Sequence, residues 1–221
     1  MKLCVIGSTF APRIFRKAWP QFGFEIVPKP QDAELVFISM DTKIEADGTR
    51  KQEGLRGAIN DIFMRVTVPM ILTSQVAPGF TRSLGMPIWH MAETLRIKDA
   101  MERALNPDYL VIGCPDGKTI PVEIMRFVHP FAAKGVSLIR CTWEEAEFSK
   151  IAVNMTLAAQ VENTNRLAAA AKQIGAEWGR IKEILSHDKR IGPHSYLEPG
   201  DWKQSSHLLR DYVTLREIEN G

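Results

Sequence analysis

The segment Lys2–Pro12, KLCVIGSTFAP, joins an apolar run to a glycine turn and then to the start of a helix. Short apolar runs rich in β-branched residues are typical of strands covered on both faces of a parallel sheet. Gly7 permits a tight turn, and Pro12 is acceptable in the first turn of a helix. The segment therefore predicts a strand, a turn and a helix, the arrangement that binds dinucleotide phosphates at a helix N-terminus.

Strand and helix patterns alternate along the first two-thirds of the chain. We expect strands at residues 2–6, 24–27, 34–39, 68–73, 109–112 and 136–140. We expect helices between them at residues 13–18, 55–66, 98–104 and 122–133. This alternation predicts an α/β domain, a trimmed Rossmann-like parallel sheet over residues 1–141.

The pattern changes at Thr142, which forms a T-x-x-E capping box with Glu145. An Ala-rich helix is expected from there to about residue 174, with Gly175 as its C-cap. Its length and its many small residues favour packing against a second copy of itself. Two shorter helices at 178–186 and 207–218 flank a loop at 189–200. Residues 142–221 are therefore predicted to be a helical dimerisation and substrate domain.

Composition excludes several classes of protein. The chain has 221 residues, 45% of them apolar, and a formal net charge of only +2, which argues against nucleic-acid binding. The densest basic stretch, residues 13–17, is interpreted as a solvated helix face. No apolar run is long enough to span a membrane, and Gly7 interrupts the N-terminus too soon for a secretory signal.

The three cysteines, Cys4, Cys114 and Cys141, have no paired spacing. An odd count of this kind suggests reduced thiols in a cytoplasmic protein, and Cys4 and Cys141 are expected to fill the core. The chain contains no CxxC or HExxH spacing, so no metal site is expected.

The phosphate-binding turn departs from G-x-G-x-x-G. Gly7 fits the first position, but Thr9 and Pro12 occupy the second and third. A Cβ at Thr9 crowds the pyrophosphate of a bound dinucleotide. The second strand runs into Val27–Pro30, VPKP, instead of the acid that holds the adenosine ribose. The turn therefore looks inherited from a dinucleotide-binding fold and poorly equipped for tight NAD binding.

Five stretches carry a more specific pattern: DAELVFISMDT (32–42), SQVAPGFTR (74–82), AETLR (92–96) with NPDYLVIG (106–113), EEAEFSKIAVNMTLA (144–158) and DKRIGPHSYLEPG (188–200). In order and content they resemble the UDP-glucose/GDP-mannose dehydrogenase family of nucleotide-sugar 6-dehydrogenases. The resemblance covers roughly residues 1–215 and includes no counterpart of that family's C-terminal domain.

The resemblance implies an NAD-dependent oxidation of a sugar's hydroxymethyl group. In the family a cysteine thiolate captures the aldehyde, and a second hydride transfer gives a thioester that water hydrolyses. Lys150 and Asn154 match the family's oxygen-stabilising Lys and Asn, and Glu93 and Asp211 match its two acids. The resemblance assigns the cofactor to Gly7, Thr9, Phe10, Thr42 and Gln75. It assigns the substrate to Arg190, Tyr196 and Leu197.

The decisive departure follows the YLEPG motif. Counting in register puts His207 at the family's cysteine, Arg210 at its Lys and Asp211 at its Asp. An imidazole cannot form the thiohemiacetal or the thioester, so the family's four-electron oxidation is not expected.

Two hypotheses remain open. In the first, the chain is a divergent oxidoreductase that stops after one hydride transfer from a nucleotide sugar or a related polar alcohol. Lys150 and Asn154 then polarise the oxygen, and His207 or Asp211 takes the proton. In the second, it is an inactive homologue that serves as a dimeric binding or regulatory module.

Overall fold

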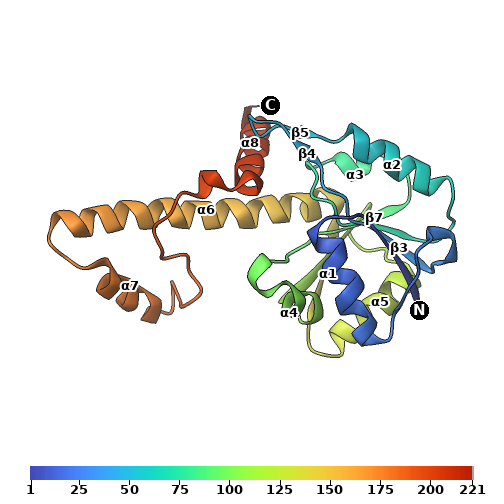
Figure 1. Ribbon diagram of the computed structural model, residues 1–221, viewed down its shortest axis with the longest axis horizontal. Coiled ribbons are helices and arrows are strands. Elements are labelled where there is room, and N and C mark those ends of the chain that lie inside the picture. The colour runs from blue at the N-terminus through green and yellow to red at the C-terminus, as the bar shows by residue number, and fades with distance from the viewer. Residues whose placement is uncertain (221) are drawn as a thin grey trace. The chain divides into compact units, whose positions relative to one another are not determined.

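The computed structural model describes residues 1–220, which divide into two compact units (Figure 1). The first unit comprises residues 1–45 and 50–150. The second comprises residues 46–49 and the chain from residue 151 onward. The division falls inside the long helix α6 (Trp143–Gln173). No helix within residues 1–220 combines the length and the apolar character that crossing a membrane requires.

A seven-stranded sheet forms the centre of the first unit, in the order β2-β1-β3-β6-β7-β8-β9. Its strands are β1 (Lys2–Ile6), β2 (Glu25–Ile26), β3 (Leu35–Ile38), β6 (Met70–Leu72), β7 (Ile88–Met91), β8 (Tyr109–Cys114) and β9 (Ser137–Thr142). Neighbouring strands are parallel except at the β7–β8 pair, where His90 lies opposite Gly113. The predicted α/β class and mainly parallel sheet are confirmed, although β8 and β9 run against the other five strands.

Helices cover both faces of this sheet. Apolar side chains of α1 (Phe10–Ala18), α4 (Ala100–Leu105) and α5 (Val122–Ala132) share one core with Val5, Phe37 and Ile112. On the other face, α2 (Glu53–Phe63) and α3 (Phe80–Ser83) share a second core with Ile38 and Leu72. The short 3-10 helices are η1 (Trp19–Phe22), η2 (Pro30–Asp32) and η3 (Ile97–Asp99).

The strand order creates a topological switch point. After β1 the chain enters α1 on one face of the sheet, and after β3 it enters α2 on the other. Ligands of open α/β sheets bind outside the carboxyl ends of the strands at such a point. The turn after β1 and the segment after β3 therefore form the expected binding edge of this unit.

The sequence patterns missed three strands and one α-helix. Strand β7 has the sequence IWHM, in which a histidine and a tryptophan interrupt the apolar run. The strands of the hairpin, β4 (Lys43–Ile44) and β5 (Arg50–Lys51), are two residues long and leave no periodic signal. Helix α3 is a single turn. Each is too short for the pattern rules, which need several repeats.

The long helix α6 begins as predicted. The backbone N–H of Thr142 donates to Glu145 Oε2 at 2.7 Å, and the N–H of Glu145 donates to Thr142 Oγ1 at 3.4 Å. This reciprocal capping box satisfies donors that the helix itself leaves unpaired. At the other end, Gly175 adopts a φ of 73°, the left-handed conformation of a helix C-cap.

The second unit contains the later turns of α6, then α7 (Trp178–His187), η4 (Trp202–Gln204) and α8 (Ser206–Asn220). Polar contacts hold both η4 and the loop between α7 and η4 against α6. Asn165 both donates to and accepts from the backbone of Gly200, and Trp202 Nε1 donates to Glu162 Oε1 at 3.0 Å. The hairpin tip also belongs here, because Gly48 packs against Leu209 and Val213 of α8.

Candidate functional site

The turn between β1 and α1 contains Gly7, Thr9 and Phe10, for which the sequence predicts contact with a cofactor. Gly7 has a φ of 134°, and a Cβ built there would lie 1.9 Å from the carbonyl oxygen of Ser39. Only glycine permits this close approach between the turn and the end of β3. Thr9 is the N-cap residue of α1, but its side chain makes no capping bond, and the exposed Phe10 begins the helix. The uncapped N–H groups of the first turn suit an anion.

Two arginines of α1 reach back to this turn. Arg16 Nη2 donates to the carbonyl oxygens of Val5 and Gly7 at 2.7 and 2.5 Å. Arg13 Nε donates to the carbonyl oxygens of Ser8 and Thr9, both at 3.1 Å. The expectation of a solvated helix face is therefore wrong for Arg16, because its guanidinium is partly buried at the strand end. Periodicity alone could not show this, since it does not report where a long side chain bends.

Thr42 and Gln75, also expected at the cofactor, lie together. Thr42 is buried and its Oγ1 lies 3.5 Å from the carbonyl oxygen of Gln75, which also accepts from Arg50 Nη1 at 3.0 Å. The Ser74 hydroxyl accepts from the N–H of Met40 at 2.9 Å. These contacts join the segments that leave β3 and β6 at the carboxyl edge of the sheet.

Glu93 and Lys150 interact within the first unit. Burial raises the pKa of Glu93, and the Asp41 carboxylate raises it further. The ammonium of Lys150 and a hydrogen bond from the N–H of Leu95 oppose that rise in pKa. A partly buried acid beside a cation is characteristic of functional sites. Asp41 is a member of this group that the sequence patterns did not identify.

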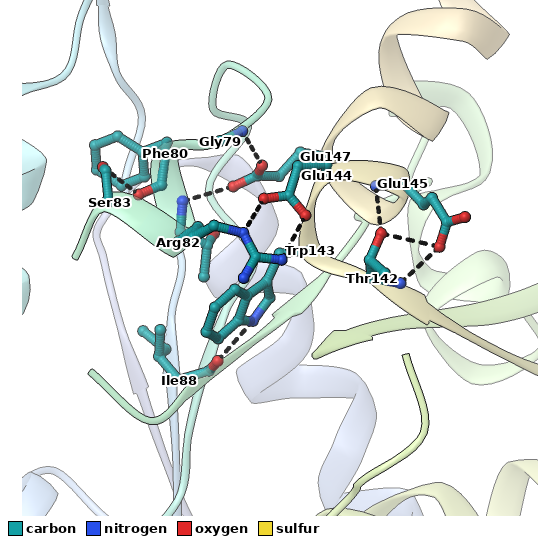
Figure 2. A network of polar contacts seen from close by, with 11 residues as sticks. Gly79, Phe80, Arg82, Ser83, Ile88, Thr142, Trp143, Glu144, Glu145 and Glu147 are labelled. Carbon is teal, nitrogen blue, oxygen red and sulfur yellow. Dashed lines mark hydrogen bonds and ion pairs between the residues drawn. The ribbon is translucent and has the colours of Figure 1, made fainter. Parts of the chain in front are cut away.

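The buried carboxylate of Glu147 ties α6 to α3 (Figure 2). Glu147 is only 1% exposed. Its carboxylate accepts hydrogen bonds from the N–H of Gly79 at 2.6 Å and from the N–H of Thr81 at 2.7 Å. Burial raises the pKa of Glu147, and the hydrogen bonds from the loop oppose that rise. Glu147 thereby fixes the PGFT part of the 74–82 motif, one helical turn before Lys150.

A second set of contacts holds the first turn of α6 (Figure 2). Arg82 pairs with Glu144 through two hydrogen bonds, of 2.5 and 3.0 Å, and its guanidinium lies 5.1 Å from the centre of the Trp143 ring. Trp143 Nε1 donates to the carbonyl oxygen of Ile88 at 2.9 Å. The sequence patterns did not predict the contacts of Glu144 and Glu147, although both residues stand inside the motif at residues 144–158.

In the second unit, Asn154 and Asp211 meet directly. Asn154 Nδ2 donates to Asp211 Oδ2 at 2.6 Å, and Arg210 Nε lies 3.3 Å from Asp211 Oδ1. Arg210 and Asp211 are both buried, whereas His207, one turn earlier on α8, is exposed. Lys150 and Asn154 are one turn apart on the continuous helix α6. Lys150 interacts with Glu93, and Asn154 donates to Asp211, so each of the two has a different predicted acid as its partner.

The three residues assigned to the substrate lie in the loop after α7. The side chain of Arg190 is exposed and pairs with Asp188 at 2.7 Å. The backbone carbonyls of Tyr196 and Leu197 accept from Thr164 Oγ1 at 2.9 Å and from Trp178 Nε1 at 3.0 Å. These bonds fix the loop by its backbone, and the substrate role of its side chains stays a prediction.

All three thiols belong to the first unit. Cys4 and Cys114 are buried, and burial raises the pKa of each thiol. Cys141 is only partly buried, yet burial raises the pKa of its thiol to about 11. A thiol held in its protonated form is a weak nucleophile. None of the three is suited to the covalent step that the aligned His207 cannot perform.

The chain is similar in sequence to one family model and to several curated proteins. Residues 144–217 match the model of the UDP-glucose/GDP-mannose dehydrogenase family, central domain. The UDP-glucose 6-dehydrogenase of Rickettsia bellii is 26% identical over 200 residues, covering 85% of this chain and 45% of that protein. The Bacillus subtilis UDP-glucose 6-dehydrogenase YwqF is 25% identical over 200 residues, covering 84% of this chain and 44% of that protein. The chain thus spans about half the length of the curated relatives it matches.

Solved structures show the same fold. A UDP-glucose dehydrogenase from Pyrobaculum islandicum superimposes with a TM-score of 0.72 at 18% identity, over 99% of this chain and 68% of that one. The sheet of the first unit and the long helix α6 are both included in that coverage. The chain is therefore similar to the UDP-glucose/GDP-mannose dehydrogenase family, and residues 144–217 match the model of that family's central domain.

Proposed function

We propose that this chain is a nucleotide-sugar dehydrogenase homologue that oxidises an alcohol to an aldehyde by one hydride transfer and does not proceed to the acid. One observation carries the proposal: Asn154 is held by Asp211 one turn after Lys150, while no cysteine occurs from residue 151 onward. The polar groups that act on an oxygen are retained, and the covalent nucleophile is absent.

Most features of the β1–α1 turn suit the phosphates of a dinucleotide, although Thr9 stands where such a turn has its second glycine. Gly7 permits the close approach of the turn to β3, the first N–H groups of α1 are uncapped, and the nearby side chains are cationic. Gly7, Thr9 and Phe10 would hold the pyrophosphate, with Thr42 and Gln75 at the adjacent strand ends. A bound nicotinamide supplies the hydride acceptor that the protein itself lacks.

The protein's own groups have separate roles in this proposal. Lys150 and Asn154 donate hydrogen bonds to the alcohol oxygen as its proton leaves. Asp211 orients Asn154 through the hydrogen bond to its Oδ2, while Arg210 holds Oδ1. The exposed imidazole of His207 takes the proton in this proposal. Glu93 balances the charge of Lys150.

Product analysis tests this function. Purified protein is incubated with UDP-glucose and with GDP-mannose in the presence of NAD or NADP, and the sugar products are identified by mass spectrometry. One reduced nicotinamide for each aldehyde is expected. Formation of the uronic acid with two reduced nicotinamides would contradict the proposal. Lys150→Ala should abolish turnover while leaving the circular dichroism spectrum unchanged, and an unaltered rate would remove Lys150 from the site.

A specific observation favours the second candidate function, a binding or regulatory module. Thr9 stands where a dinucleotide turn needs glycine, and the covalent nucleophile is missing. Calorimetry separates the two candidates. Nucleotide-sugar binding without any nicotinamide binding at millimolar concentration would favour the module over the enzyme.

We also propose a homodimer, because the second unit exposes apolar residues on its helices. Leu167 of α6 is 43% exposed and Ile184 of α7 is 70% exposed. Helix α7 contains no buried residue at all. Packing against a second copy would cover this apolar surface.

A further inference from the structure

Beyond Leu3, the carbonyl groups of β1 that face β2 receive no backbone hydrogen bond from that strand. Leu3 O accepts from the N–H of Val27 at 2.9 Å, the last backbone bond described between the two strands. The next residue, Pro28, has no N–H to donate. Alternate carbonyls of a strand point to the same side, so Val5 O faces the position that β2 has left. Arg16 Nη2 fills this position and bonds both Val5 O and Gly7 O.

A guanidinium thus lies between the glycine turn and the end of β2, where a bound dinucleotide would place its adenosine ribose. One of its nitrogens serves the two carbonyls, which leaves Nε and Nη1 as further donors. Among residues 1–220, no carboxylate forms an ion pair with Arg16 within salt-bridge distance. The positive charge of the Arg16 guanidinium is therefore available to a ligand.

Further cations surround the same point. Lys29 follows Pro28 at the end of β2, is exposed, and forms no ion pair within the described part of the chain. Arg13 lies on the turn itself through its bonds to Ser8 and Thr9. Asp32 of η2 is an exposed acid in the same region: it raises the pKa of the Cys4 thiol, whereas Arg16 lowers it. Three cations, Arg13, Arg16 and Lys29, therefore belong to this edge together with the carboxylate of Asp32.

We propose that this edge selects a dinucleotide whose adenosine ribose bears a 2′-phosphate, so that NADP is preferred to NAD. In sites for NAD, a carboxylate at the end of the second strand accepts from the ribose hydroxyl, and it would repel a phosphate. Here Val27–Pro30 supplies no carboxylate, and Arg16 and Lys29 supply the charge-assisted donors that a phosphate prefers. The inference rests on the dinucleotide site of the proposed function and adds its specificity.

Calorimetry on the full chain tests the preference with fragments. Adenosine 2′,5′-bisphosphate is compared with ADP, and NADP with NAD, at two salt concentrations. The 2′-phosphorylated member of each pair should bind about tenfold tighter or more, as one or two charge-assisted bonds predict. The difference should shrink at high salt, because exposed charges are screened.

Variants assign the preference to residues. Lys29→Glu should reduce or reverse it without disturbing the fold, since Lys29 is exposed. Lys17→Glu, an equal charge change at an exposed position of α1, should leave the preference in place. Arg16→Met should remove it, with a thermal melt to show that the variant is folded. A preference that survives Lys29→Glu and a folded Arg16→Met would overturn the assignment.

The possible failures are distinguishable. Equal or tighter binding of NAD would overturn the 2′-phosphate inference and leave the proposed oxidoreductase intact. Absence of binding for all four compounds at millimolar concentration would overturn both the inference and the enzymatic proposal.

Discussion

The amide Nδ2 of Asn154 donates a hydrogen bond of 2.6 Å to the carboxylate of Asp211, a residue with no exposed surface. A buried carboxylate is costly unless its oxygens are paired, and the other oxygen of Asp211 is held by Arg210. This bond joins the long helix α6 to the final helix α8 inside the second unit. It also keeps the Asn154 amide in one orientation, a condition for acting on a substrate oxygen.

Replacement of Asn154 should therefore destabilise the second unit. Asn154→Ala removes one hydrogen bond from a buried carboxylate, which costs about 1.5 to 3 kcal/mol. The better helix propensity of alanine offsets roughly 0.5 kcal/mol of this loss. Urea denaturation followed by circular dichroism measures the change. Thr156→Ala, at an exposed position of the same helix, should stay within about 0.5 kcal/mol of the parent protein. Equal stability of the two variants would contradict the role given to Asn154.

Glu147 and Glu144 should differ sharply in their effect on stability. Glu147→Ala leaves the buried N–H groups of Gly79 and Thr81 without an acceptor, at a cost of about 2 to 4 kcal/mol. Glu144→Ala removes only a pair whose side chains are 38% and 51% exposed, which is worth at most about 1 kcal/mol. The midpoint of urea denaturation should fall for the first variant and barely move for the second. A reversed order would show that the surface pair, and not the buried carboxylate, anchors α6.

Glu93 should make stability depend on pH. Burial raises its pKa above the ordinary value of 4.5, so the folded protein binds this proton more tightly than the unfolded chain does. The stability that the neutral acid contributes is complete below pH 4.5 and is lost as the pH rises through the raised pKa. Glu93→Gln keeps an acceptor for the Leu95 N–H and removes the buried charge. The variant should therefore be at least as stable as the parent at pH 7, with its advantage vanishing below pH 4.5.

Denaturation of both proteins across this pH range measures the effect. Glu198→Gln, at an exposed position in the loop after α7 where Glu198 pairs with Lys182, provides a control for the same change of residue outside a buried site. If Glu93→Gln were less stable than the parent at neutral pH, the ionised carboxylate would be a net stabilising group, and its predicted titration would be wrong.

The proposed dimer can be disrupted at α6. Leu167 and Ile174 are seven residues apart, which is two turns of helix, so their side chains point to the same face. Both side chains are exposed. Leu167→Glu places a charge in any interface that covers this surface and should give a monomer by light scattering at micromolar concentration. Lys172→Glu, on the same helix at an exposed position, changes charge without removing apolar surface and should remain dimeric. A monomeric parent protein would end the dimer proposal.

The sequence determined the sheet strands that are continuous apolar runs, such as β1 and β3, and both ends of α6. Their signals are local: an uninterrupted run between turn residues, a capping box at Thr142 and a glycine at 175. The resemblance to the dehydrogenase family also predicted four catalytic residues: Lys150, Asn154, Glu93 and Asp211. Local patterns could not identify β7 or the β4–β5 hairpin, because two to four mixed residues carry no period.

Only the tertiary structure decided how those residues are used. It paired Asn154 with Asp211 across 57 positions of sequence, and it directed Glu147 onto the N–H groups of Gly79 and Thr81. It also bent Arg16 onto the end of β1, where β2 leaves two carbonyls without a strand partner. The physical reason is that a side chain's charge, burial and hydrogen bonds depend on neighbours distant in sequence. A linear pattern names the residue type, and folding supplies its partner.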